Sequence, residues 1–417
     1  MTVPGATCKV QGAVLGAGCL VLSVVLMCAV PISAQVAVRG ETVHTMAGAP
    51  IKDGVVLVGK DGKIERVGPA TSVGVPAGYK LLRAKVVTPG LVDAHSVVGL
   101  AGYLNQPHDQ MQLETSSAIQ PELRAIDAYN ARETLVEWLR VHGVTTVHTG
   151  HAPGALVPGQ TMVVKTRGDE VEQSVMVPMA TVAATLGTGG LAGQGKSPGN
   201  RSKAVAMLRA ELIKAKDYVA KQAGPEDKRP ARDLKLEALG KVISKDVPLL
   251  VTANRANDIL TALRLAKEFD IRIVLDGAAE AYTVVDQIKA ASVPVILHAT
   301  MSRAGGDAEN MSMETAATLR KAGIPVALQS GYEGYVPKTR VVLFEAALAA
   351  ANGLTFEQAL ATVTIDAAKI IGVDKRVGSL EAGKDGDLAL FDGDPFEYVT
   401  HVTGVLIDGV VVSESPQ

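Results

Sequence analysis

The chain has 417 residues, of which 47% are hydrophobic and 20% are charged, and its formal net charge is −2. This composition is typical of a globular protein and argues against intrinsic disorder. Because there is no excess of positive charge, nothing indicates binding to nucleic acid or to an anionic membrane surface. A chain of this length suits one large barrel accompanied by a smaller part.

The first 34 residues are typical of a targeting segment. Lys9 supplies a positive charge, residues 13–30 carry none, and the small residues of Pro31-Ile32-Ser33-Ala34 provide a cleavage site after Ala34. We therefore expect residues 1–34 to be a signal peptide and the protein to be exported, to the periplasm or the cell exterior. An uncleaved membrane anchor is the alternative, because the apolar run is close to the shortest length that spans a bilayer.

All three cysteines of the chain, Cys8, Cys19 and Cys28, lie in this segment. The mature chain would therefore have no disulfide, no thiolate metal site and no cysteine nucleophile. A chain without cysteine suits an oxidising compartment, which agrees with the expected export.

Strand patterns occur at both ends of the mature chain. Near the N-terminus, the apolar runs 55–58 and 63–67 flank Asp61-Gly62, which is a strong hairpin signal. A similar pattern returns from Gly378 onward. We predict that residues 35–87 and 371–417 together form a small β-sandwich module.

Residues 88–370 alternate between strand-like and helical stretches. Near-continuous Val, Ile and Leu in the strands predicts parallel strands that are buried on both faces. The expected strands are 143–147, 247–252, 271–275, 293–297 and 324–328, and the expected helices are 202–221, 257–269, 281–290, 313–321, 341–351 and 356–368. This spacing favours a closed TIM-like (β/α)8 barrel over an open doubly wound sheet, since no glycine-rich phosphate fingerprint follows an early strand.

The stretch 86–98 opens this barrel and ends on polar residues. Leu91 and Val92 follow a Pro-Gly corner and lead to Asp93 and His95. Barrel active sites lie at the C-terminal ends of strands, so these side chains are expected at a site. A second metal-binding histidine would be expected two residues later on the same face, but that position is Val97.

Several segments of the chain resemble the amidohydrolase superfamily, in its imidazolonepropionase-like branch. The matching segments are 55–68, 88–95, 143–147, 364–372 and 378–388. They are spread over nearly the whole mature chain. The resemblance implies a hydrolase of non-peptide C–N bonds that uses one or two divalent metals, and it implies a homo-oligomer.

The metal ligands of that family do not carry over. The resemblance places ligand histidines at the ends of the first, fifth and sixth strands and a catalytic aspartate at the end of the eighth. The matching positions here are Val97, Thr252, Gly277 and Gly331. These residues cannot replace imidazoles, and glycine cannot act as a general base, so the standard two-metal mechanism is excluded.

Other residues near predicted strand ends are candidates for a relocated site. The candidate metal ligands are His95, His148, His151 and His298. Neutral imidazoles bind zinc, and Asp276 or Glu280 would then act as a catalytic base or orient a ligand. The alternative is a mouth without metal, where the histidines bond to loop backbone.

Two cationic residues each have two possible roles. Arg255, just after the predicted fifth strand, is a candidate for binding a substrate carboxylate, or it pairs with Asp258. Lys165 either resembles a bridging lysine of some relatives or lies at an exposed strand end.

Three functions therefore stay open. The protein is a metal-dependent hydrolase with a relocated zinc site, a pseudoenzyme that binds a small molecule or partners an active paralogue, or a structural protein of the cell envelope. The sequence does not decide whether the chain is an enzyme.

Overall fold

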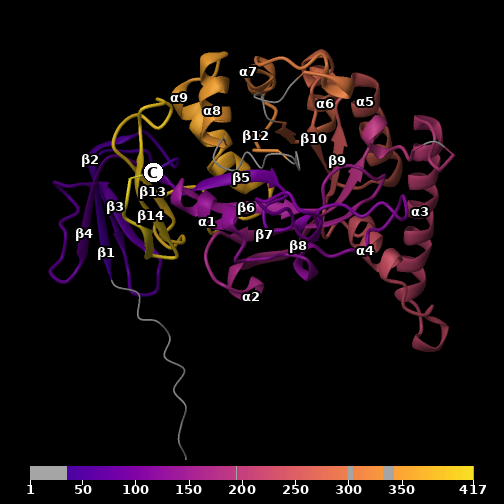
Figure 1. Cartoon of the computed structure of the whole chain (residues 1–417), viewed down its shortest axis with the longest axis horizontal. Helices are drawn as coiled ribbons and strands as arrows, with labels where there is room; N and C mark the ends of the chain where they lie inside the picture. The colour runs from indigo at the N-terminus through magenta and orange to yellow at the C-terminus, as the bar shows by residue number, and fades with distance from the viewer. Residues whose placement is uncertain (1–34, 194, 299–303, 332–341, 417) are drawn as a thin grey trace, which may run out of the picture. The chain divides into compact units, whose positions relative to one another are not determined.

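The structure is a computed structural model that describes residues 35–193, 195–298, 304–331 and 342–416. Its strands form two sheets, one of seven strands and one of eight (Figure 1). The predicted signal peptide, with Cys8, Cys19 and Cys28, lies outside the described residues. Within the described ranges, no helix combines the length and the apolar character needed to cross a membrane.

The seven-stranded sheet combines both ends of the chain, in the order β15-β14-β13-β4-β1-β2-β3. Its strands are β1 (Val36–Val43), β2 (Ile51–Val58), β3 (Ile64–Pro69), β4 (Lys80–Pro89), β13 (Leu388–Phe391), β14 (Val402–Ile407) and β15 (Val410–Ser413). Strand β4 is the junction, because it pairs parallel with β1 and antiparallel with β13. Both predicted segments thus contribute to one sheet, and a β-sandwich is not confirmed.

The hairpin predicted around Asp61-Gly62 joins β2 to β3. The amide of Gly59 donates to the carbonyl oxygen of Lys63 over 2.8 Å. Gly62 has a φ of 76°, and a Cβ there would lie 2.3 Å from the carbonyl oxygen of Asp408 in the turn after β14. Glycine is therefore required by both the backbone conformation and the close approach of the C-terminal turn.

The eight-stranded sheet has the order β12-β11-β10-β9-β8-β7-β6-β5. Its strands are β5 (Leu91–Ser96), β6 (Val144–Gly150), β7 (Gly159–Lys165), β8 (Val175–Thr185), β9 (Leu249–Ala253), β10 (Ile273–Gly277), β11 (Val295–Leu297) and β12 (Val326–Leu328). All neighbours are parallel except β7, which runs antiparallel to β6 and β8.

The orientation of β7 corrects the prediction of a regular (β/α)8 barrel. The connection from β6 to β7 is short, and only the four-residue helix α2 (Val171–Ser174) stands between β7 and β8. Parallel strands need a crossover of about a dozen residues or more, which neither connection provides. The barrel is TIM-like and nearly closed, because Ser96 at the end of β5 bridges to Gly331 after β12.

The helices lie mainly between the later strands of the barrel (Figure 1). They are α1 (Thr134–Val141), α3 (Arg201–Gln222), α4 (Leu234–Ile243), α5 (Ala256–Phe269), α6 (Val285–Ala291), α7 (Thr315–Lys321), α8 (Val342–Ala351), α9 (Phe356–Thr362) and α10 (Ile365–Ile370). The predicted helix 356–368 is divided, because Thr364 leaves helical geometry with φ −139° and ψ −102°. Its hydroxyl bonds to the carbonyl oxygen of Leu360 over 2.6 Å, which competes with continued helix.

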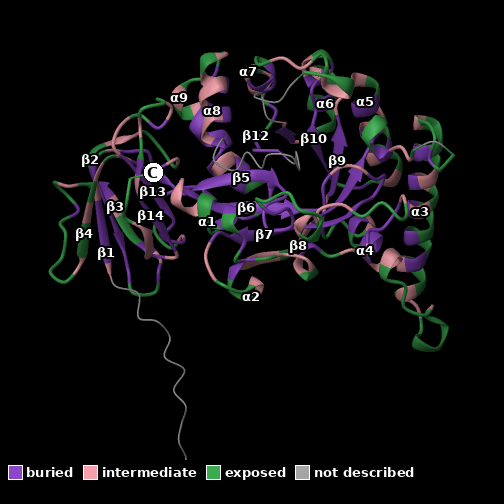
Figure 2. Ribbon diagram, viewed as in Figure 1, coloured by how far each residue is buried: buried purple, intermediate pink, exposed green. Residues whose placement is uncertain are grey.

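The barrel strands are buried except for the first half of β8, whereas the outer helices present exposed faces (Figure 2). One apolar layer fills the barrel interior with side chains from six of the eight strands: Val92, Val163, Leu250, Val274, Ile296 and Ala327. Helix α10 adds Ala367 and Ala368 to this cluster. This layer is a packed core, as in other small barrels, and it supports the residues that follow it along each strand.

Lys165 is buried at the end of β7. The prediction that it lies at an exposed strand end is therefore wrong. Its Nζ lies 2.7 Å from Asp385 and 2.9 Å from Asp387, and it also pairs with Asp408. Because β7 runs antiparallel, its end faces the seven-stranded sheet instead of the barrel mouth, so Lys165 is not placed as a bridging lysine. We call Lys165, Asp385, Asp387 and Asp408 the lysine cluster.

Candidate functional site

A polar layer lies directly above the apolar layer of the barrel. Alternate residues on a strand share a face, so Thr252, Asp276 and Gln329 follow Leu250, Val274 and Ala327 into the same interior. On β7, which runs the other way, Thr161 precedes Val163. His95 and His148 complete the layer from β5 and β6. All of these side chains are buried.

Asp276 is the centre of this polar layer. Its Oδ1 accepts hydrogen bonds from His95 Nδ1 over 2.9 Å and from Gln329 Nε2 over 2.8 Å, and its Oδ2 accepts one from Thr252 Oγ1 over 2.6 Å. Burial alone would raise the pKa of this carboxyl, but His95 and the hydrogen bonds outweigh it and hold the pKa below its ordinary value. Asp276 is therefore an ionised carboxylate whose two oxygens are both bound by protein donors.

His148 is held as a neutral imidazole. Its Nδ1 donates to the carbonyl oxygen of Ala94 over 2.7 Å, and its Nε2 accepts from Thr161 Oγ1 over 2.6 Å. The chain of bonds continues from Thr161 to Thr181, whose hydroxyl oxygens are 2.6 Å apart. Burial and the neighbouring His95 lower the pKa of His148 to about 3. Both ring nitrogens are thus used, so neither is available to a metal in this arrangement.

Asp93 joins the first barrel strand to the last. Its carboxylate accepts from the amide of Ser330 over 3.0 Å and from the Ser330 hydroxyl, and it also accepts from the amide of His95 over 3.3 Å. Burial raises the pKa of Asp93 to about 6 despite these bonds. The pair bridges the same strands as the Ser96–Gly331 contact and so helps to close the barrel.

The other two candidate histidines each pack against a glycine at or near a strand end. His151 is buried between β6 and β7, where a Cβ on Gly159 would come within 2.3 Å of its ring. Burial lowers its pKa. His298 follows β11, and a Cβ on Gly331 would lie 2.6 Å from its Cε1. The imidazole of His298 thus occupies the space that a side chain at position 331 would need.

The donor set does not fit a metal of the kind the family resemblance implies. Among the described residues, no group of three or more His, Cys, Asp or Glu side chains is arranged to hold a metal ion. The nitrogens of His148 and the oxygens of Asp276 are bound by protein groups, and Val97 is a buried apolar residue. The relocated site of His95, His148, His151 and His298 is not assembled in this part of the chain.

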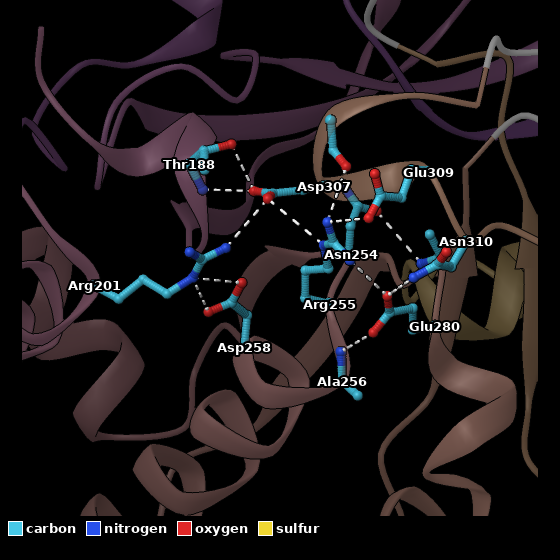
Figure 3. Close-up of polar contacts among 12 residues, drawn as sticks. Thr188, Arg201, Asn254, Arg255, Ala256, Asp258, Glu280, Asp307, Glu309 and Asn310 are labelled. Carbon is cyan, nitrogen blue, oxygen red and sulfur yellow. Dashed lines mark hydrogen bonds and ion pairs between the residues drawn. The ribbon is translucent and has the colours of Figure 1, made fainter.

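Arg255 belongs to a network of charges at the barrel rim (Figure 3). Its guanidinium lies 3.2 Å from Glu280, 2.7 Å from Glu309 and 3.9 Å from Asp307. Asp258, the partner considered from the sequence, pairs with Arg201 over 2.9 Å instead. Arg255 is therefore already neutralised by carboxylates of the chain, which leaves it poorly suited to a substrate carboxylate.

The same network connects loops that follow four successive strands. Asp307, after β11, accepts from the amide of Thr188, after β8, over 2.5 Å and from its hydroxyl over 2.7 Å. Glu280, after β10, accepts from the amide of Ala256, which follows β9, over 2.8 Å. We call Arg201, Arg255, Asp258, Glu280, Asp307 and Glu309 the rim network.

Sequence reasoning missed Gln329 and Thr161 as members of the polar layer. The signal was present: Gln329 lies two residues after a buried Ala327, just as Asp276 lies two after Val274. Thr161 could not be found in this way, because its inclusion depends on the antiparallel direction of β7.

Comparisons with known proteins agree over most of the chain. The sequence signature described as Amidohydrolase family matches residues 279–413. The imidazolonepropionase of Brucella anthropi is 26% identical and aligns over 86% of this chain and 91% of its own length. That of Rhizorhabdus wittichii is 25% identical, over 85% of this chain and 92% of its own. The crystal structure of an amidohydrolase from Thermotoga maritima is 29% identical, with a TM-score of 0.83, and covers 91% of this chain and 100% of that chain.

Proposed function

Because the chain belongs to the amidohydrolase superfamily, in its imidazolonepropionase-like branch, we propose that it is a member that has lost metal-dependent hydrolysis. In this proposal the barrel has become a pseudoenzyme that binds a small molecule at its mouth. The relatives are named as hydrolases, and superfamily members typically depend on a metal. In this proposal, hydrogen bonds from protein side chains to Asp276 take the place of that metal.

The observation that carries the proposal is the bonding of Asp276. A carboxylate that is to bind a metal or take a proton from water must present an oxygen to it. Both oxygens of Asp276 are instead bound by His95, Thr252 and Gln329. These three donors occupy most of the acceptor positions of the carboxylate, and they supply the compensation that a buried carboxylate needs without a metal ion.

The test combines metal analysis with an activity assay. The protein is purified from cells supplied with zinc and manganese, its metal content is measured by mass spectrometry, and hydrolysis of imidazolonepropionate and a panel of cyclic amides is followed. We expect far less than one metal ion per chain and no turnover, while the imidazolonepropionase of Brucella anthropi, assayed in parallel, is active. One equivalent of metal together with hydrolysis that a chelator abolishes would refute the proposal.

The His95–Asp276 contact favours a second candidate, metal-independent hydrolysis of a C–N bond. A carboxylate bound to Nδ1 fixes the tautomer of an imidazole and stabilises its protonated form, which prepares the other nitrogen to act as a general base. This candidate predicts turnover that persists in a chelator and falls by about 10²-fold or more in His95→Gln. Equal rates in His95→Gln and the unmodified protein would exclude it.

We also propose that the protein is exported and that its leader is removed. The sequence pattern of residues 1–34 supports this proposal. N-terminal sequencing of the protein isolated from its native cells should begin at Gln35. A chain that begins at Met1 and sediments with membranes would instead support the anchor.

A homo-oligomer or a complex with an active paralogue is part of the same proposal. The family resemblance supports the homo-oligomer, and the loss of the family's ligand residues at the strand ends supports the paralogue partner. Light scattering after size-exclusion chromatography measures the number of chains in the homo-oligomer. Co-purification from native cells detects the complex with a paralogue.

A further inference from the structure

A large cavity lies at the opposite end of the barrel strands from the polar layer. It has a volume of about 1140 Å³ and is lined by the first residues of β10, by Pro248, Pro294 and Pro325 before β9, β11 and β12, and by helices α5, α6 and α10. Ile273 and Val274 contribute to its wall, whereas Asp276 lies further along the same strand. The cavity is therefore separate from the candidate site at the mouth.

The cavity is apolar with a cationic border. Thirteen of its nineteen lining residues are Ala, Val, Leu, Ile or Pro, and none is Asp or Glu. The charged lining residues are Arg264, Lys267, Arg272 and Lys369, all of which are exposed. A cavity of this size exceeds the usual range for small-molecule sites, so it has room for a long, flexible ligand.

Among the described residues, little of the positive charge of this border is engaged by carboxylates, although Lys369 lowers the pKa of Glu381 by electrostatic attraction. In the described ranges, none of the four cations forms a salt bridge, although Arg272 donates to the carbonyl oxygens of Lys245 and Asp246. The carboxylates nearest in sequence are engaged by other cations. These pairs are Glu268 with Arg209, Asp270 with Lys245, and Asp366 with Arg320.

From this combination we propose that the cavity binds an amphiphilic anion, a carboxylate carrying a long alkyl chain. The alkyl chain occupies the apolar wall, where each buried CH₂ group gains about 0.8 kcal/mol. The carboxylate lies at the cationic border, beside Lys267. Lys and Arg side chains reach such a position by laying their apolar stems along the wall while the charged ends remain in water.

The test measures binding of dodecanoate, below its micelle concentration, to the full chain by calorimetry. We expect one dodecanoate per chain, with weaker binding of butanoate, which lacks the long chain, and of 1-dodecanol, which lacks the charge. Lys267→Glu should weaken dodecanoate binding by about threefold to tenfold, because it replaces an attraction by a repulsion at the border. Lys203→Glu, an exposed site on α3 outside the cavity, makes the same charge change and should have no effect.

A second variant separates loss of binding from loss of folding. Ala290→Trp places an indole in the wall at an exposed position of α6 and should abolish dodecanoate binding without lowering the unfolding temperature. The proposal is overturned if dodecanoate does not bind, if dodecanol binds equally well, or if Lys267→Glu and Lys203→Glu behave alike. It is also overturned if sedimentation shows a dimer that Ala290→Trp dissociates, since the cavity would then be an interface between copies of the chain.

Discussion

Two carboxylates at the barrel mouth are equally buried, yet their pKa values shift in opposite directions. Asp276 is surrounded by donors and by His95, so its pKa falls below the ordinary value. Asp93 receives its bonds from Ser330 and from a backbone amide, and burial raises its pKa to about 6. At the scale of single residues, the number and charge of the partners therefore decide the protonation state.

Asp93 should make the stability of the protein depend on pH. Its pKa is about 6 when folded and near 3.9 in an unfolded chain, so the folded state binds this proton more tightly. The resulting stabilisation is complete below about pH 4 and is lost as the pH rises through about 6. The free energy of unfolding of Asp93→Asn, relative to the unmodified protein, should rise by up to about 3 kcal/mol between pH 4 and 7.5.

Urea unfolding at both pH values measures this difference. His148 titrates in the same range with the opposite sign, because burial lowers its pKa and the unfolded chain takes up the proton first. That contribution is common to both proteins and cancels in the comparison. Parallel pH profiles for the two proteins would show that Asp93 is not the group responsible.

Asp276→Asn should destabilise the protein. An asparagine presents one acceptor oxygen and turns an NH₂ group toward donors that the carboxylate had accepted. We expect the free energy of unfolding to fall by about 2–4 kcal/mol, because polar groups are left buried without partners. Asp286→Asn, an exposed site on α6, is the matched control and should change it little. Similar values for both variants would contradict the central role of Asp276.

At the scale of elements, the lysine cluster fastens β7 to the C-terminal strands. Asp385 has a pKa lowered to about 2: burial would raise it, but Lys165 and other cations outweigh that effect. Asp387 is fully buried, and burial raises its pKa even with Lys165 beside it. The segment 378–388, which is one of those that carry the family resemblance, thus contributes two carboxylates to a structural contact.

Lys165→Met should be severely destabilising for that reason. The substitution removes the cation that pairs with the buried Asp387, whereas Asp385 keeps Lys63 and Arg376. A loss of about 3 kcal/mol is expected in urea unfolding. The double variant Lys165→Met/Asp387→Asn should recover part of the loss, because fewer unpaired charges remain. Lys60→Met, in an exposed turn, serves as control. Equal stability of the single and double variants would argue against the cluster as a unit.

The elements differ in how well the sequence predicted them. The five predicted barrel strands and most helices are present, because runs of Val, Ile and Leu and helical periodicity are local signals. The direction of β7 and the burial of Lys165 were not predictable in this way. A buried strand has the same pattern in either direction, and the partners of Lys165 lie more than two hundred residues along the chain.

The candidate site was predictable only in part. His95, His148 and Asp276 were placed correctly at strand ends, but their bonding partners depend on register across the barrel. Thr161 and Gln329 decide whether those side chains are available for chemistry. Neither residue type suggests a site in a sequence, since threonine and glutamine are common at strand ends.

At the scale of the whole molecule, the described residues between 35 and 416 form one compact unit. The only tryptophan, Trp138, lies on α1, which contacts β6 in the barrel and β14 and β15 in the seven-stranded sheet. The side chain is partly exposed, so its fluorescence should report on the unfolding of α1, the helix that contacts both sheets. Unfolding curves from Trp138 fluorescence and from far-UV circular dichroism should coincide, as expected for a single cooperative transition. Separate midpoints would show that the two sheets unfold independently.

The pairing of β4 with β13 also determines the order in which the chain can mature. Strand β4 is synthesised before the barrel, and β13 after it, so Val86 to Pro89 have no partner on that side until translation is nearly complete. An unpaired apolar strand edge is a template for aggregation, and pairing across so long an intervening sequence is slow. The nascent protein therefore depends on protection of this edge, by a chaperone or by rapid collapse of the barrel, until its last thirty or so residues have emerged.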